Sequence, residues 1–310
     1  MKIVVTGGAG YIGSMLVSDL LNSGHKVTVI DNLTYNQTSI SHLIGNKNLE
    51  FVFKDIRNVS NIKNYYSQAD VIIPLAAIVG APACAKDPLL ATSTNKDAII
   101  DMLKILSTNQ RVIMPTTNSA YGSGDGLNYC DETSELNPLS LYAKDKVEIE
   151  KIVMNNHNAT SFRLATVFGV SPRMRLDLLV NNFVYRALTD KFIVLFEGYF
   201  KRNYVHVRDV SNVFKFAIEN PDKVAGEVFN FGLTSANISK EELCEKIKFQ
   251  IPEFIYTEAP LAKDPDQRNY IVSNQKIEVL GAGAKIEISQ GISELIKGLK
   301  MFVKYPFSNL

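Results

Sequence analysis

The sequence has no run of 18 apolar residues, no excess of one charge and no low-complexity tract. Without a long apolar run, no membrane-spanning helix is expected. The 33 basic and 32 acidic residues leave a net charge of +1, so we expect no nucleic-acid partner. The first residues, MKIVVTGGAG, reach glycine too early for the apolar region of a signal peptide.

Cysteine is also scarce. Cys84, Cys130 and Cys244 are scattered along the chain without the spacing of metal ligands. We therefore expect no metal site. Three reduced thiols in a cytoplasmic protein are the simplest interpretation of this usage.

What the sequence does contain is a series of short β-branched runs separated by amphipathic segments. One such segment, 11–24, has a helical pattern that ends on Gly24. Nearly continuous apolar strands alternating with helices predict an α/β fold, with a parallel sheet covered on both faces. The expected strands are 2–6, 25–31, 49–55, 70–76 and 111–117.

The pattern changes after about residue 165, where helices mix with short strands such as 227–232. We predict a first domain over 1–165 and a smaller α/β lobe over 166–310. Some later elements are expected to cross back to the first domain.

Three glycines follow the first expected strand. Gly7, Gly10 and Gly13 form Gly-x-x-Gly-x-x-Gly between that strand and an amphipathic helix, the context of a Rossmann-type dinucleotide fingerprint. Asp31 ends the second strand, where a carboxylate binds ribose hydroxyls and repels a 2′-phosphate. This arrangement predicts NAD rather than NADP. The alternative is a glycine-rich turn followed by an unrelated acidic residue.

Two more strand ends would lie at the same carboxyl edge of the sheet, where α/β proteins bind ligands. Asp55 ends the third strand, and Leu75, Ala76 and Ala77 end the fourth. Asp55 could accept a hydrogen bond from the adenine amino group, or it could instead be a helix N-cap.

A tyrosine and a lysine lie four residues apart at the start of an expected helix. Tyr142 and Lys146 therefore share one helix face. Thr117 ends the strand 111–117, and the motif AYG follows it. Taken with the glycine loop and the later motifs RNYVHVRDV (202–210) and DQRNYIVSNQK (266–276), the chain resembles the extended short-chain dehydrogenase/reductase family.

The resemblance implies roles for these residues. Tyr142 would be the general base on a sugar hydroxyl, with its pKa lowered toward neutrality. Lys146, with the nicotinamide cation, would stabilise the phenolate and bind the nicotinamide ribose, and Thr117 would hydrogen-bond the same substrate oxygen. The implied NAD-binding residues are Gly7, Gly10, Tyr11, Ile12, Gly13, Asp31, Asn32, Asp55, Ile56, Leu75, Ala76, Ala77, Asn95, Tyr142 and Lys146.

The same resemblance implies a nucleoside-diphosphate sugar as substrate. Arg202 and Arg268 match positions that clamp a diphosphate, for which guanidinium groups are suited. Arg175 and Asn182 lie in the segment that contacts nucleotide and sugar.

Thr166 stands where familiar epimerases have asparagine, and Val79 stands where galactose epimerases have lysine. These departures predict different contacts around the sugar. His206 is expected to be structural.

Three reactions begin with oxidation at sugar C4. A 4,6-dehydratase needs an acid/base pair beside the catalytic threonine, but Asn118 and Ser119 follow Thr117 here. A 4-epimerase returns the hydride to the other face, whereas a 4-dehydrogenase releases the ketone. The segments 75–88 and 171–183 look closest to bacterial surface-polysaccharide enzymes, which favours a GDP-manno-heptose-like substrate and a 4-dehydrogenase. A non-catalytic NAD-binding protein is the remaining alternative.

The resemblance also implies a homodimer. The helical region 88–106 and the Tyr-Lys helix 141–155 would form a four-helix bundle with a second copy. An apolar stripe at 98–106 fits this interface, and it equally fits a core-facing helix.

Overall fold

The computed structural model describes residues 1–123, 128–156, 158–259 and 268–302. Seven parallel strands form the central sheet. Their spatial order is β3 (Leu49–Phe53), β2 (Lys26–Asp31), β1 (Lys2–Thr6), β4 (Val71–Pro74), β5 (Arg111–Thr117), β7 (Asn158–Leu164) and β11 (Val228–Phe231). The predicted doubly wound parallel sheet is confirmed.

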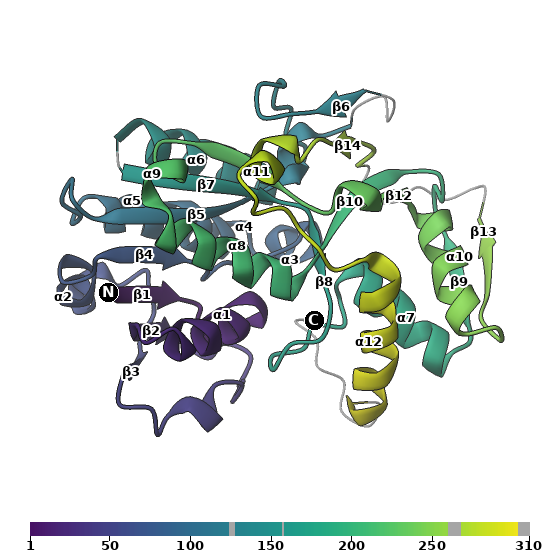
Figure 1. Ribbon diagram of the computed structural model, residues 1–310, viewed down its shortest axis with the longest axis horizontal. Helices are drawn as coiled ribbons and strands as arrows, with labels where there is room; N and C mark the ends of the chain where they lie inside the picture. Colours follow the sequence, from purple (N-terminus) through teal and green to yellow (C-terminus); the bar gives the residue numbers. More distant parts are fainter. Residues whose placement is uncertain (124–127, 157, 260–267, 303–310) are drawn as a thin grey trace.

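Helices cover both faces of this sheet, as Figure 1 shows. Alternate side chains point to opposite faces of each strand, so Ile3 and Val5 face one layer while Val4 faces the other. The first layer contains α1 (Tyr11–Asn22), α8 (Val207–Glu219), α9 (Pro221–Val224) and α11 (Gln275–Val279). The second contains α2 (Lys63–Ser67), α5 (Ala98–Leu103) and α6 (Leu141–Asn156).

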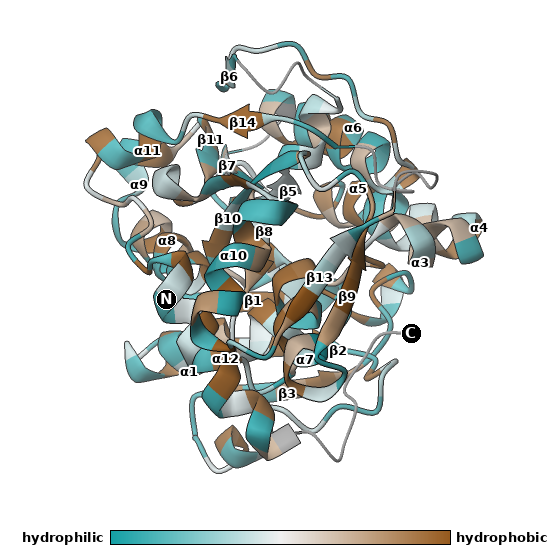
Figure 2. Ribbon diagram, turned by 90° about the vertical axis from the view of Figure 1, so that its right-hand side faces the viewer, coloured by the Kyte–Doolittle hydropathy of each residue, from teal (hydrophilic) through white to brown (hydrophobic). Residues whose placement is uncertain are grey.

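The remaining elements form a second lobe, at the right of Figure 1. Its apolar core includes Ile288, Ile292, Leu295 and Leu299, which lie on one face of α12. Figure 2 shows the matching brown and teal stretches along that helix. The lobe contains β8 (Thr166–Phe168), α7 (Leu179–Thr189), β9 (Phe192–Leu195), β10 (Lys201–His206), β12 (Asn237–Ser239), α10 (Lys240–Gln250), β13 (Ile255–Glu258) and α12 (Ile288–Phe302).

Short elements complete the chain. They are the 3-10 turns η1 (Ser41–Leu43), η2 (Val59–Asn61), η4 (Asn118–Tyr121) and η5 (Thr234–Ala236), the helices α3 (Ala81–Lys86) and α4 (Pro88–Thr92), the π-helical turn η3 (Ser93–Asp97), and the paired strands β6 (Tyr129–Cys130) and β14 (Ile271–Val272). No helix within the described ranges is both long and apolar enough to span a membrane.

Two expected strand ends were wrong by two residues. The third strand stops at Phe53, because Asp55 turns back to accept hydrogen bonds from Arg57. The fourth stops at Pro74, which has no N–H to continue the ladder. The predicted end of α1 is confirmed: Gly24 has φ +79, and the next residue, His25, donates from its backbone to Leu20 O.

The strand expected at 227–232 is β11, and it belongs to the seven-stranded sheet. The chain therefore returns to the first sheet after building part of the second lobe. The division of the chain at residue 165 stays a prediction, and residues 303–310 of the second predicted unit lie outside the described residues.

A buried carboxylate joins α6 to the sheet. Glu150 accepts hydrogen bonds from Thr116 Oγ1 at 2.7 Å and Ser161 Oγ at 2.8 Å. Its other oxygen pairs with Arg163 Nη2 at 2.7 Å, and both side chains are less than a tenth exposed. Arg163 also donates to the hydroxyl of Tyr121 at 3.0 Å. The network therefore holds one helix, two strands and the turn η4 in a fixed arrangement.

We predict that Arg163→Met lowers the free energy of unfolding by about 3–5 kcal/mol, because it leaves the Glu150 carboxylate buried without its counter-ion. Urea unfolding measures the change. Arg186→Met is the control, since Arg186 forms an exposed pair with Asp190 and its loss should cost roughly 0.5 kcal/mol or less. Equal losses of stability from the two substitutions would contradict the role of Arg163 as the counter-ion of the buried Glu150 carboxylate.

Candidate active site

The glycine loop packs directly against the end of β4. Gly7 has φ +67, and a Cβ there would lie 2.6 Å from Ala76 N. A Cβ on Gly13 would lie 2.4 Å from Gly7 O. Helix α1 begins at Tyr11 with no acidic residue in its first turn, so the positive end of its dipole is not neutralised there. This cradle fits a pyrophosphate, and side chains at these glycines would fill it.

Asp31 is held at the end of β2 by backbone and side-chain donors. Its Oδ2 accepts from Ala9 N at 3.0 Å, and its Oδ1 accepts from Leu33 N at 2.9 Å and Gln37 Nε2 at 3.2 Å. Burial raises the pKa of this carboxyl, whereas the two backbone donors and the charge of Arg173 lower it. The carboxylate sits where the dinucleotide fold binds ribose hydroxyls.

Asp55 lies two residues after the end of β3, next to a turn at residues 56–57. It pairs with Arg57 at 2.6 Å, and this contact lowers the pKa of its carboxyl. Asn32 donates weakly to it at 3.4 Å. The helix N-cap interpretation is wrong, because η2 begins after Asn58. Ile56 is buried in the apolar core.

The loop after β4 is fixed through Ile78. Its N–H donates to Asn95 Oδ1 at 2.8 Å, and its carbonyl accepts from Asn95 Nδ2 at 2.9 Å and Cys84 Sγ at 3.3 Å. Ala76 N donates to Thr6 Oγ1 at 3.3 Å. The Asn95 side chain therefore holds the loop that carries the predicted NAD residues 75–77. The sequence analysis did not predict that Cys84 would help to hold this loop.

Helix α6 packs against β5 and η4, and the charge of Arg268 acts on the Tyr142 phenol at the start of that helix. Thr117 Oγ1 donates to Ser119 Oγ at 3.0 Å and accepts from Ser119 N at 3.1 Å. Arg268 also donates to the Ser119 hydroxyl. The three predicted catalytic residues and one predicted diphosphate ligand thus converge on one region.

Burial changes the pKa values of both members of the Tyr-Lys pair in the chain without NAD. Burial raises the pKa of Tyr142 to about 12; the nearby Cys84 thiol adds to this, and the charges of Arg175 and Arg268 oppose it. The predicted lowering toward neutrality is therefore not a property of the chain by itself, because desolvation disfavours the phenolate. Burial also lowers the pKa of Lys146 to about 8, an effect that Asp145 opposes.

The predicted substrate residues lie on several elements. Arg175 pairs with Asp177, and Asn182 Nδ2 donates to Leu176 O at 3.0 Å. Thr166 lies opposite Tyr204 in the β8–β10 ladder. Burial raises the pKa of the Tyr204 phenol, and the charges of Arg202 and Arg268 both oppose that rise. Residues 266 and 267 of the Arg268 motif lie outside the described residues.

His206 is structural, as expected. It is 1% exposed at the end of β10, and its Nδ1 accepts from Arg208 N at 3.2 Å. Burial lowers the pKa of its imidazole to about 4. Gly169 packs so closely that a Cβ would lie 2.4 Å from His206 Nε2.

Sequence reasoning missed the contacts between the lobes. The Tyr11 hydroxyl, predicted only as part of the NAD loop, donates to Gly169 O at 2.6 Å. Asn181 Nδ2 donates to the same hydroxyl at 3.3 Å, and Ser171 Oγ donates to Tyr11 O at 2.6 Å. The one sequence signal for these contacts was Tyr11 itself, a residue with a hydroxyl group in the first turn of α1.

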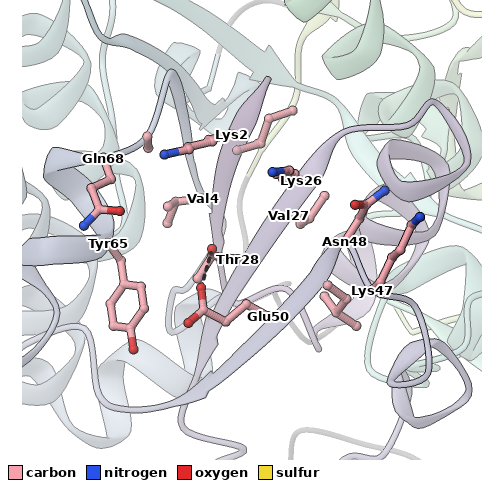
Figure 3. Close-up of a pocket in the computed structure, with 13 residues that line it drawn as sticks. Lys2, Val4, Lys26, Val27, Thr28, Lys47, Asn48, Glu50, Tyr65 and Gln68 are labelled. Carbon is pink, nitrogen blue, oxygen red and sulfur yellow. Dashed lines mark hydrogen bonds between the residues drawn. The ribbon is translucent and has the colours of Figure 1, made fainter.

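A hollow of about 260 Å³ lies elsewhere, at the amino-terminal edge of β1, β2 and β3. Figure 3 shows Lys2, Lys26 and Lys47 around it, with Thr28 Oγ1 donating to Glu50 at 3.1 Å. Parallel sheets bind ligands at their carboxyl ends, so this hollow is not the candidate active site.

Residues 3–232 match the model of the NAD dependent epimerase/dehydratase family. This match covers well over half of the chain. The chain belongs to this family. Family membership makes it an enzyme with NAD as its cofactor, and the glycine cradle, Asp31 and the braced loop after β4 fit that cofactor.

The relatives of this epimerase/dehydratase chain are named for different activities. It is 27% identical to a putative UDP-glucose 4-epimerase of Methanocaldococcus jannaschii, over 96% of this chain and 98% of that protein. It is 23% identical to UDP-glucuronic acid decarboxylase 1 of Danio rerio, over 99% of this chain and 75% of that protein.

Among solved structures, UDP-glucuronic acid 4-epimerase of Bacillus cereus, in complex with UDP-glucuronic acid and NAD, superposes with a TM-score of 0.86 at 25% identity. The match covers 97% of this chain and all of that one. The decarboxylases are a class that the sequence interpretation did not weigh.

We predict that Lys146 makes the stability of the NAD-free protein pH-dependent. Its pKa falls from 10.5 to about 8 on folding, so the unfolded chain holds the extra proton between these values. Stability relative to Lys146→Met should therefore rise by about 2 kcal/mol between about pH 7.5 and pH 9.5. Urea unfolding at both pH values measures this rise. Lys144→Met, an exposed change on the same helix, should track the wild type; the same pH slope in wild type and Lys146→Met would contradict the prediction.

Proposed function

We propose that this enzyme oxidises C4 of a nucleoside-diphosphate sugar. The observation that carries the proposal is that hydrogen bonds join Thr117, Ser119 and Arg268 after β5, while the charge of Arg268 acts on the Tyr142 phenol. NAD, held by the glycine cradle and Asp31, would supply the hydride acceptor for C4. The remaining events are the work of this chain's own side chains.

Tyr142 takes the proton of the C4 hydroxyl, so that the alcohol becomes a ketone as the hydride leaves. Thr117 hydrogen-bonds the same oxygen and fixes its distance from the phenol. Its hydroxyl already lies in a hydrogen-bonded pair with Ser119, which restricts its rotamer. Lys146 supplies positive charge, which favours the phenolate over the neutral phenol that burial otherwise maintains.

Arg202 and Arg268 bind the diphosphate in this proposal. The charges of both guanidiniums act on the Tyr204 phenol, and guanidinium groups form charge-assisted hydrogen bonds with phosphate oxygens. Arg175 also lies in this region, but Asp177 neutralises part of its charge. It is therefore assigned to orienting the sugar rather than to holding phosphate.

We favour release of the 4-ketone, as in a 4-dehydrogenase with a GDP-manno-heptose-like substrate. Dehydration is disfavoured because Asn118 cannot act as an acid and the Ser119 hydroxyl is engaged by Thr117 and Arg268. The 4-epimerase is the second candidate, and the likeness to the Bacillus cereus 4-epimerase supports it. Decarboxylation would in addition require a carboxylate on the sugar.

A panel of GDP-, UDP- and dTDP-sugars, with and without a 2-keto acid as hydride acceptor, tests the proposal. Product NMR distinguishes a free 4-ketone, an epimer, a 4-keto-6-deoxy sugar and a decarboxylated sugar. A ketone that accumulates only with the acceptor supports the dehydrogenase. An epimer formed without it supports the second candidate.

We predict that Tyr142→Phe lowers kcat by roughly 10²–10⁴-fold, because it removes the group proposed to take the hydroxyl proton. NAD affinity should stay close to that of the wild type. Stopped-flow absorbance at the NADH band measures turnover, and Tyr129→Phe, an exposed tyrosine on β6, is the control. Turnover that survives Tyr142→Phe would overturn the mechanism.

A further inference from the structure

Hydrogen bonds fix the segment between β8 and α7 against the start of α1, next to the glycine loop. Besides the contacts of Tyr11 with Gly169 and Ser171, the hydroxyls of Ser14 and Ser171 lie 3.1 Å apart. All of these contacts are buried. Asn181 Oδ1 accepts from Gly169 N at 2.9 Å and so fixes the other side of the same segment.

This segment carries Arg173 to the adenosine side of the cofactor site. Arg173 is 6% exposed, and its guanidinium carbon lies 5.2 Å from the centroid of the Tyr35 ring. Tyr35 belongs to the loop after β2, which is tied to the glycine loop by Ser39 Oγ donating to Ala9 O at 2.7 Å. The charge of Arg173 also acts on Asp31. Arg173 of the segment after β8 therefore lies near the end of β2, where Asp31 is proposed to bind the ribose.

We propose that Arg173 and Tyr35 form a clasp, a contact between the lobes that retains the adenosine end of NAD. A guanidinium stacked on an aromatic face is held by both its charge and its planar shape. For the cofactor to leave, the loop after β2 must move away from the segment 169–178. The clasp therefore limits the rate of cofactor release. This inference rests on NAD binding and does not depend on the C4 chemistry.

The experiment measures dissociation of NADH without any sugar. Purified protein loaded with NADH is mixed with excess NAD, and the loss of bound NADH fluorescence gives the rate. Arg173→Met and Tyr35→Leu should each release NADH about tenfold faster, as expected for the loss of a desolvated cation–π contact. Tyr35→Phe keeps the ring and should release NADH at the wild-type rate.

Further measurements of the NADH release rate test whether Arg173 and Tyr35 act as one contact. The double variant should be no faster than the faster single variant, because both changes remove one contact. Arg186→Met, an exposed arginine on α7, should leave the rate unchanged. Folded Arg173→Met and Tyr35→Leu proteins that release NADH within twofold of wild type would overturn the clasp, as would additive effects in the double variant or fast release from Tyr35→Phe.

Discussion

One buried carboxylate fixes the geometry on which the candidate site depends. Glu150 joins α6 to β5 and β7 through Thr116, Ser161 and Arg163. Thr116 immediately precedes Thr117, and Glu150 lies one helical turn after Lys146, so this network sets how the Tyr-Lys face meets the strand end. A buried charge is costly unless it is fully paired, and here both of its oxygens are engaged.

The same burial that fixes the site sets its protonation. Desolvation keeps the phenol of Tyr142 neutral and lowers the pKa of Lys146 to about 8, so neither group is charged as strongly as it would be in water. Positive charge near the phenol comes from Arg175 and Arg268, which lie on the second lobe. The proton chemistry of the pair thus depends on what the second lobe and the bound ligands add.

The two lobes are joined where the cofactor site lies. Tyr11, on the first turn of α1, makes hydrogen bonds to the segment that also carries Arg173 and Arg175. Arg173 acts toward Asp31, and Arg175 acts toward Tyr142. One segment after β8 therefore supplies two buried arginines whose charges act on Asp31 and on Tyr142 respectively.

The sequence alone determined five strands of the sheet, the glycine loop, Asp31 at a strand end and the Tyr-Lys face, because strand periodicity, glycine spacing and i, i+4 spacing are local properties; β7 was not among the expected strands. Tertiary structure decided that β11 returns to the first sheet, that Asp55 turns to Arg57, and that Arg173 reaches Tyr35. It also decided that burial raises the pKa of Tyr142, against the expectation from its motif. Contacts and desolvation depend on residues far apart in the chain, so no local pattern contains them.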